Sequence, residues 1–371
     1  MRLSDFVIMN PSEKLPKGSI AKKISMDQIV PFQKHISSYS LEAYSGGAKF
    51  RNGDTIMARI TPCLENGKTA FVSILDDGEC GFGSTEYIVF RAIPNVSLPD
   101  FVYYLTISKI VREPAIKSMV GSSGRQRVQQ SVLDELEIHD YSLTEQQHIV
   151  DILGSIDEKI ENNEKKIVRL TDLGLLTYQD FVCHNDYELV ELNELVKIGR
   201  GASPRPIQNY LTQEGNPWVK ISDVTSLKTP FLYKTSEYIT DEGTKRSVAV
   251  FPDDLILSNS ATPGLPLFVE LPAFVHDGWL TIRDFKIITP NYLYWVLKKD
   301  REKILSQGNG SIFTNLKTDI LKQHKIPVPN EGIMNVLDKK FSTILDSIKQ
   351  LTIENIKFNK LKQFYLKKFF G

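Results

Sequence analysis

The sequence has no long hydrophobic run, little cysteine and no excess of charge of either sign. No apolar stretch reaches the roughly eighteen residues of a membrane-spanning helix, so we expect no membrane span. The N-terminal residues lack the apolar segment of a secretory signal, and the three cysteines (Cys63, Cys80 and Cys183) are odd in number and far apart. These absences predict a cytoplasmic protein without disulfide bonds or a zinc site.

Motifs for catalysis and cofactor binding are also missing. The chain contains no Walker loop, no HExxH pattern, and no Asn-Pro-Pro-aromatic or Asp-Pro-Pro-aromatic loop such as amino-methyltransferases use to hold a flipped base. Gly81-Phe-Gly83 precedes a strand-like stretch rather than a helix, so we interpret it as a turn. Asp253 and Asp254 are likewise interpreted as a turn rather than a metal-binding pair. We therefore expect a binding protein that is not an enzyme and holds no metal or cofactor of its own.

What is present describes an ordinary soluble protein of about two domains. The chain has 371 residues, of which 41% are hydrophobic and 24% charged. The 45 basic residues balance the 45 acidic ones, which by itself argues against nucleic-acid binding. The distribution of the charges along the chain is more informative than their sum.

Residues 144–182 predict one long helix. Apolar residues recur there in steps of mostly three and four, and no proline interrupts them. These positions are Ile149, Leu153, Ile156, Ile160, Ile167, Leu170 and Leu173. Thr144 and Gln147 fit a capping box that would fix the start of the helix. Asn163 stands where the heptad expects an apolar residue, and a polar residue there usually sets register or partner choice.

A second helix resembling the first ends the chain. A shift of 188 residues places 153–160 over 341–348, Leu173 over Leu361 and Leu176 over Phe364. A globular segment precedes each helix. In the first segment we predict strands at 20–27, 55–60, 69–75 and 85–92, a helix at 99–111, a glycine-rich turn at 121–127 and a closing segment at 132–138. Residues 220–223, 253–258, 290–297 and 308–311 echo 23–26, 53–58, 99–106 and 121–124, so the chain reads as two copies of one unit.

The two helices differ in charge. Residues 145–182 contain eight acidic and four basic side chains, whereas residues 339–371 contain eight lysines and two acidic side chains. This complementarity suits two helices that pack on each other within one chain. The alternative is that both charged faces are simply solvated.

The duplication and the helix sequence ILGSIDEKIENNEKKI resemble the specificity subunit (HsdS) of type I restriction-modification systems. The resemblance covers essentially the whole chain and implies a mixed α/β fold. It implies four segments: a first target recognition domain (1–142), a first conserved spacer helix (143–184), a second target recognition domain (185–331) and a second spacer helix (332–371). The two helices would pair antiparallel and hold the domains apart.

The resemblance also implies partners. Each domain would read one half of a split, asymmetric double-stranded DNA target, and the helices would dock two methyltransferase subunits. The complex would recruit restriction subunits, so S-adenosylmethionine, ATP and Mg2+ would be used by the partners. Two other readings remain open, namely a free-standing DNA-modifying enzyme and a protein scaffold whose two domains bind peptides or sugars.

Two sets of residues follow as candidates for these roles. The seam between the helices would comprise Ile149, Leu153, Ile156, Ile160 and Ile167 against Phe341, Ile344, Ile348, Leu351 and Phe358. DNA contacts need Lys and Arg for phosphates and Arg, Asn or Gln for base edges. The polar loops offer Lys22, Lys23, Arg59, Lys68, Arg125, Gln126, Arg127, Arg200, Arg205, Lys220, Lys245, Arg246, Asn259 and Arg283. For each of these the alternative is a solvated surface charge, and for Trp218, Trp279 and Trp295 it is core packing.

If the helices space the two readers, their length sets the unread gap between the half-sites. One added heptad lengthens a helix by about 10 Å at 1.5 Å per residue. We therefore expect a chain with one heptad inserted to recognise a target whose gap is about 3 base pairs longer. Mapping the recognised sequence checks this, and an unchanged gap contradicts it.

Overall fold

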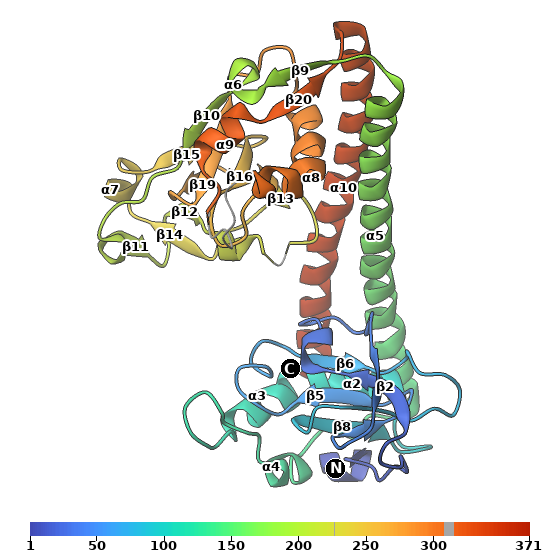
Figure 1. Cartoon of the computed structure of the whole chain (residues 1–371). Helices are drawn as coiled ribbons and strands as arrows, with labels where there is room; N and C mark the ends of the chain where they lie inside the picture. Colours follow the sequence, from blue (N-terminus) through green and yellow to red (C-terminus); the bar gives the residue numbers. More distant parts are fainter. Residues whose placement is uncertain (226, 308–314) are drawn as a thin grey trace. The chain divides into compact units, whose positions relative to one another are not determined.

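The computed structural model describes residues 1–225, 227–307 and 315–371 and divides them into two compact units. One unit comprises residues 1–161 and 356–371, and the other residues 162–355. Each contains a globular domain and a part of each of two long helices, α5 (Leu143–His184) and α10 (Glu331–Phe370) (Figure 1). No helix among the described residues is long and apolar enough to span a membrane.

The first domain is built on two small sheets. Its elements are α1 (Leu3–Phe6), β1 (Val7–Met9), β2 (Ile20–Ile24), β3 (Ser40–Ala43), β4 (Lys49–Phe50), β5 (Thr55–Ala58), β6 (Thr69–Phe71), β7 (Gly81–Gly83), β8 (Tyr87–Ala92), α2 (Pro99–Ile107), α3 (Lys109–Lys117) and α4 (Gln130–Asp134), with a 3-10 turn at Met26–Gln28. One sheet is antiparallel, in the order β1-β8-β5-β6, and the other has the order β3-β2-β7-β4 with β2 and β7 parallel. The alternation of buried apolar strands and polar turns confirms the mixed α/β fold predicted for this segment.

The second domain repeats this plan with additions. Its elements are β9 (Glu188–Glu191), α6 (Leu192–Leu195), β10 (Lys197–Arg200), β11 (Leu211–Thr212), β12 (Asn216–Val219), β13 (Phe231–Leu232), β14 (Glu237–Ile239), α7 (Asp241–Thr244), β15 (Val248–Val250), β16 (Leu255–Ser258), β17 (Pro266–Val269), β18 (Ala273–Val275), β19 (Trp279–Arg283), α8 (Pro290–Ser306), α9 (Thr318–Gln323) and β20 (Lys325–Val328), with 3-10 turns at Ile207–Asn209 and Ile221–Asp223. The sheets have the orders β10-β19-β16-β17-β13 and β11-β14-β12-β18-β15, and β20 pairs with β9.

The sheet orders show the duplication directly. The strands β1, β8, β5 and β6 correspond to β10, β19, β16 and β17. The parallel pair of β2 with β7 likewise corresponds to the parallel pair of β12 with β18. The predicted strands at 20–27, 55–60, 69–75 and 85–92 are β2, β5, β6 and β8 with shorter bounds. The echo at 308–311 of the glycine-rich turn lies outside the described residues.

Three local predictions are wrong. Gly81-Phe-Gly83 is not a turn but the buried strand β7, in which a Cβ at Gly83 would lie 2.4 Å from the carbonyl oxygen of Ile24 on the parallel neighbour. Glycine is therefore required there by close backbone approach. The helix predicted at 99–111 ends at Ile107, because Ser108 adopts an extended conformation and α3 begins after it.

The third error concerns the start of α5. The capping box is formed by Ser142 and Glu145, two residues before the predicted one at Thr144 and Gln147. The Ser142 amide donates to the Glu145 carboxylate over 2.8 Å, and the Glu145 amide donates to the Ser142 hydroxyl over 3.3 Å. Gln146, fully buried, then ties α5 to the chain before α2, since it accepts from the Leu98 amide and donates to the Val96 carbonyl, both over 2.8 Å.

The apolar contacts between α5 and α10 belong to two hydrophobic cores, one in each unit. Ile149 and Leu153 pack in the first core with Leu366 and Phe370, which the sequence had not singled out for the seam. Ile167 packs in the second core with Phe341, Ile344, Ile348 and, partly buried, Leu351. In each unit the N-terminal part of one helix thus lies with the C-terminal part of the other, as antiparallel pairing requires. Ile156 is buried, whereas Ile160 and Phe358 are half-buried, and Leu173, an apolar position of the predicted helix, is exposed.

Polar contacts also join the helices. The Asn163 amide donates to Glu354 over 3.1 Å and to Asn355 over 3.0 Å, so this heptad position does carry a polar cross-helix contact. Lys362 and Asp157 form a buried ion pair of 2.6 Å. Lys349 of α10 instead pairs with Asp253 and Glu270 of the second domain, and five acidic residues of α5 are exposed (Glu145, Asp151, Glu158, Asp172 and Asp180). The opposite charges of the two helices therefore form one buried ion pair between them, Lys362 with Asp157, and most of the other charged side chains lie on solvated faces.

Candidate nucleic-acid interface

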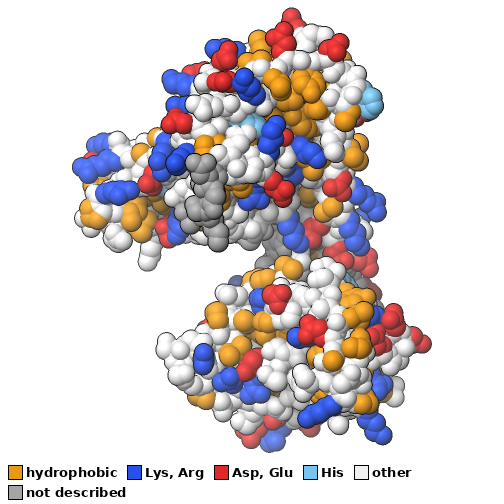
Figure 2. Space-filling view, in the orientation of Figure 1, with side chains coloured by type: hydrophobic (Ala, Val, Ile, Leu, Met, Phe, Trp, Pro, Cys, Tyr) orange, Lys and Arg blue, Asp and Glu red, His pale blue; other side chains and the backbone are white. Residues whose placement is uncertain are grey.

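On the face seen in Figure 2, the basic side chains form no single large patch, and Lys and Arg are interspersed with Asp and Glu over both units. No group of three or more His, Cys, Asp or Glu among the described residues is placed to hold a metal ion. A nucleic-acid site therefore has to be sought in local grooves and loops.

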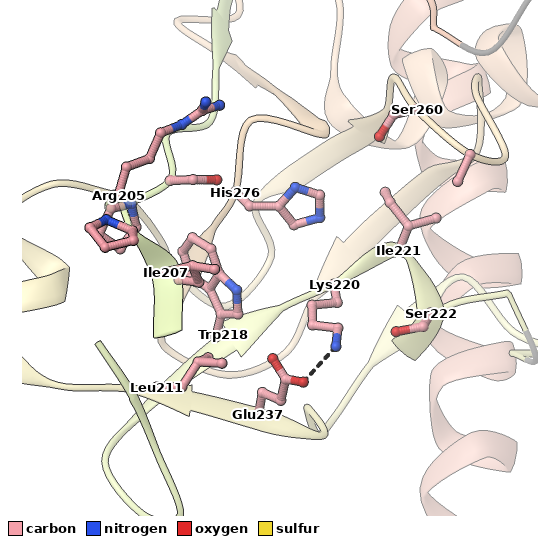
Figure 3. A pocket seen from close by; sticks show the side chains of 14 residues that line it. Arg205, Ile207, Leu211, Trp218, Lys220, Ile221, Ser222, Glu237, Ser260 and His276 are labelled. Atoms are coloured by element: carbon pink, nitrogen blue, oxygen red, sulfur yellow. Dashed lines mark hydrogen bonds and ion pairs between the residues drawn. The ribbon is translucent and has the colours of Figure 1, made fainter. Parts of the chain in front are cut away.

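One concavity of the second unit is a groove of about 1050 Å³. Six segments form it: the loop after β10, β11, the end of β12 with its 3-10 turn, the start of β14, the turn after β16, and the turn between β18 and β19. Its lining includes Ser203, Arg205, Trp218, Lys220, Ser222, Glu237, Ser260 and His276 (Figure 3). Gly201 brings the first segment onto β18, because a Cβ there would lie 2.1 Å from the His276 carbonyl oxygen. The loop is thereby fixed at its base and polar at its tip.

Asp277 organises the mouth of the groove. Its carboxylate accepts a hydrogen bond from the Ser203 hydroxyl (2.6 Å) and pairs with Arg205 (3.2 Å), while its carbonyl accepts from Arg200 Nε (2.9 Å) and Asn259 Nδ2 (3.2 Å). The hydrogen bond from Ser203 lowers the pKa of Asp277 below its usual value. The carboxylate is thus ionised at neutral pH and holds Arg205 beside the groove, while the Asp277 carbonyl holds Arg200.

The groove floor combines an aromatic side chain with an uncharged histidine. Trp218 is buried and its ring centroid lies 6.0 Å from that of His276. Burial lowers the pKa of His276, and its Nδ1 accepts from the Gly278 amide over 2.8 Å, so the ring is neutral with its proton on Nε2. Lys220 is turned toward Glu237 at 2.6 Å (Figure 3). The groove thus offers a hydrogen-bond donor on the neutral His276 ring and the ion pair of Lys220 with Glu237.

Equivalent positions in the two domains carry equivalent and different residues. Lys23 pairs with Glu42 (2.8 Å) as Lys220 pairs with Glu237, each from a strand to its antiparallel neighbour. Arg59 and Asn259 follow β5 and β16 at the same place, with amides that donate to the chain just before β8 and β19. Arg59 is half-buried and donates weakly to the Val128 carbonyl (3.4 Å); Asn259 is buried, and its Oδ1 has no hydrogen-bond partner among the described residues.

Several predicted DNA-contacting residues have internal partners. Lys22 is buried and pairs with Asp76 and Glu79 at 2.8 and 2.9 Å. Arg283 pairs with Asp254 (3.1 Å) and thereby stabilises the turn before β16. Arg91, at the equivalent strand position of the first domain, pairs with Asp54 (2.7 Å) and stabilises the turn before β5. Lys68 donates to the Met26 carbonyl (2.6 Å), and Arg127 forms a two-pronged pair with Glu86. Lys22 and Arg283 thus stabilise the fold, and we do not count them among the proposed DNA contacts.

The remaining candidates lie at the surface. Arg125, Arg200, Arg205, Lys245 and Arg246 are exposed, and Gln126 is half-buried. Lys245 pairs with Glu242 (2.7 Å), and the Arg246 guanidinium lies 5.5 Å from the centroid of Tyr210. All three tryptophans are buried; Trp279 and Trp295 pack in hydrophobic cores as expected, whereas Trp218 lies at the floor of the groove. Sequence reasoning missed His276 and Asp277, although a His-Asp-Gly turn between two strands was a readable signal.

Comparisons with known proteins agree with this architecture. The chain matches the family described as type I restriction modification DNA specificity domain over residues 3–172 and 184–363. It is 25% identical over 192 residues to the MjaIX specificity subunit of Methanocaldococcus jannaschii, an alignment that covers 50% of this chain and 41% of that protein. It is 33% identical over 105 residues to the EcoAI specificity subunit of Escherichia coli, covering 28% of this chain and 18% of that one. These alignments thus span less than half of each relative.

A solved structure shows the same fold. The crystal structure of a type I restriction-modification S subunit from M. genitalium has a TM-score of 0.61 and 17% identity, with 100% of this chain and 95% of that one covered. Two matched regions, one for each copy of the domain-and-helix unit, account for most of the 371 residues. The chain belongs to the type I restriction modification DNA specificity domain family.

Proposed function

We propose that this chain gives a type I restriction-modification complex its DNA-sequence specificity, each globular domain reading one half of a bipartite, asymmetric target. The observation that carries the proposal is a repeated scaffold with unlike loops. The sheets correspond strand by strand, while the residues that follow equivalent strands differ, as Arg59 and Asn259 do. A fixed frame with variable contact residues suits two readers of unrelated half-sites.

The groove of the second domain is the reading surface we favour. The exposed Arg205 lines the groove, and the exposed Arg200 donates to the Asp277 carbonyl beside it. Both suit phosphate contacts, which exposed arginine and lysine commonly make. The His276 Nε2 proton and the hydroxyls of Ser222 and Ser260 line the interior and suit base edges. In the first domain the exposed Arg125 and its neighbour Gln126 would serve the same purpose.

The proposed partners of the helices are two methyltransferase subunits. Leu173 and Leu176 of α5 are 50% and 62% exposed, and the equivalent Leu361 and Phe364 of α10 are 40% and 60% exposed. Large exposed apolar side chains mark interaction surfaces, and here the same pair recurs at a shift of 188 residues. A duplicated surface suits two copies of one partner. Restriction subunits would join through that complex, and S-adenosylmethionine, ATP and Mg2+ would be bound by the partners.

The proposal is tested by mapping methylated adenines in cells that express the chain with its methyltransferase. We expect one split motif with two unrelated halves and a fixed gap. Exchanging residues 187–330 for those of a relative should change one half only, because that segment forms one reader. A stable complex without any methylation motif would contradict the proposal and favour a scaffold that binds other ligands.

The roles assigned to the arginines predict opposite effects of two substitutions. Arg205→Gln should weaken DNA binding and reduce the slope of log affinity against log salt by about 1, with little change in stability. Arg283→Gln should leave that slope unchanged and lower the stability of the second unit by about 1–3 kcal/mol, since it strands Asp254. Binding titrations over a range of salt, with thermal unfolding of both variants, check this. If Arg283→Gln also reduces the salt slope, Arg283 contacts DNA and its assignment to the fold alone is wrong.

A further inference from the structure

One buried polar contact of the first unit has no counterpart in the second. In the first unit Asp157 of α5 accepts hydrogen bonds from the Tyr104 hydroxyl (2.8 Å) and from Lys362 of α10 (2.6 Å). All three side chains are buried, and Lys362 Nζ also lies 5.9 Å from the centroid of the Tyr103 ring. The carboxylate thus has one cationic and one neutral partner within the interface between the first domain and the two helices.

The second unit has apolar residues at the equivalent places. The shift of 188 residues places Asp157 over Leu345 and Lys362 over Gly174, and the echo of 99–106 in 290–297 places Tyr104 over Trp295. Leu345 and Trp295 are buried in one core. A Cβ at Gly174 would lie 2.3 Å from the Trp295 ring, so the indole fills the space that a side chain would otherwise occupy. A polar triad in one unit is replaced by a tryptophan and a glycine notch in the other.

The surrounding positions do not distinguish the units in this way. Ile149, Leu153 and Ile156 of the first unit correspond to Leu337, Phe341 and Ile344 of the second, and all are buried and apolar. On the opposite helix Leu366 and Phe370 correspond to Tyr178 and Val182. Residues of this kind tolerate exchange if their total volume is kept. Among these buried positions, the triad and its apolar counterpart therefore distinguish the two interfaces.

A wrong pairing would be costly in either direction. If the first domain and the start of α5 met the end of a second α5, Asp157 would face a glycine and be buried without its cation. If the second domain met the end of a second α10, Lys362 would be driven against Trp295. A buried charge without a partner and an overfilled core are both strongly unfavourable. Specificity against a similar competitor commonly depends on such repulsive elements.

We propose that Tyr104, Asp157 and Lys362, with Trp295, Leu345 and Gly174, form a pairing code that makes the first half of the chain associate with the second half rather than with a copy of itself. The partner that each helix surface fits is thus the complementary half. The duplicated units are otherwise similar enough to permit symmetric pairs of like halves. The code keeps two different domains in one module.

The test uses the full chain with a protease site inserted between Asn185 and Asp186, in an exposed segment after α5. The folded protein is cleaved, diluted until the halves dissociate and then reconcentrated, and native mass spectrometry counts the pairs. In the unsubstituted chain we expect like pairs (first half with first half, or second half with second half) to make up fewer than about one in ten of all pairs. Free re-pairing would instead make about half of all pairs like pairs.

Two reciprocal variants make both interfaces the same. One carries Tyr104→Trp, Asp157→Leu and Lys362→Gly, and the other carries Trp295→Tyr, Leu345→Asp and Gly174→Lys. Each should raise like pairs to about half, because every combination of halves is then complementary. Either variant suffices if the other fails to fold. Lys360→Gly, an exposed lysine on the same helix, is the matched control and should keep the pairing of the unsubstituted chain.

Two results would overturn the proposal. One is like pairs in the statistical proportion from the unsubstituted chain. The other is an absence of like pairs from the triple variants, which would place discrimination elsewhere in the interface.

Discussion

Lys362→Met should lower the stability of the first unit by about 3–5 kcal/mol, the cost of removing one partner from a buried ion pair. Asp157 is 7% exposed, and after the substitution it keeps only the Tyr104 hydroxyl as a neutral partner. Lys34, which lies 5.1 Å from the centroid of the Tyr104 ring, is already engaged by Asp100 at 2.6 Å. The measurement is thermal or urea unfolding, followed by a probe placed in the first unit because the two units need not unfold together.

The double variant Asp157→Leu with Lys362→Met supplies the control. It removes both charges, so it should recover most of the lost stability, since apolar replacement of a buried pair is often neutral or stabilising. Lys360→Met, at an exposed position of the same helix, should change stability by less than about 0.5 kcal/mol. If Lys362→Met is as mild as Lys360→Met, the ion pair is not an effective part of the interface.

The sequence was informative about the fold wherever a pattern was repeated. The long helices could be predicted because their apolar steps run over many turns, and the duplication because short motifs recurred in the same order. The start of α5 was misplaced because Ser142-Leu-Thr-Glu145 and Thr144-Glu-Gln-Gln147 both fit a capping box, and only the fold decides between them. The strand β7 was missed because Gly81 and Gly83 read as a turn until a neighbouring backbone is known to approach them.

The candidate site was harder to predict, since charge alone does not say which partner a side chain has. Lys22 and Arg283 look like Arg125 in the sequence, yet Lys22 is buried against Asp76 and Glu79 and Arg283 pairs with Asp254. Such pairs join residues distant in the chain and leave no local signal. For the groove residues His276 and Asp277 the sequence offered only a His-Asp-Gly turn, and their importance follows from the four hydrogen-bonding partners that converge on Asp277.

The two glycines of α5 should respond in opposite directions to alanine. Gly154→Ala should stabilise the first unit by about 1 kcal/mol, because alanine favours the helix and a Cβ there would meet only the Tyr104 hydroxyl at 3.9 Å. Gly174→Ala carries the same helix gain but pushes a methyl group to within 2.3 Å of the Trp295 ring. Overfilling a packed core costs about 1–3 kcal/mol and at times more, so the second unit should lose stability.

Trp295 has little room to yield. It is fully buried, with ring centroids of Tyr294 at 4.9 Å and Phe341 at 5.8 Å, so a shift of the indole would disturb both neighbours. We therefore expect the two alanine variants to differ by about 1–3 kcal/mol in unfolding free energy, each measured with a probe in its own unit. Trp295→Leu should relieve the conflict and restore part of the stability of Gly174→Ala. Equal effects of the two alanines would mean that helix propensity alone governs both sites and that the notch at Gly174 does not hold the tryptophan.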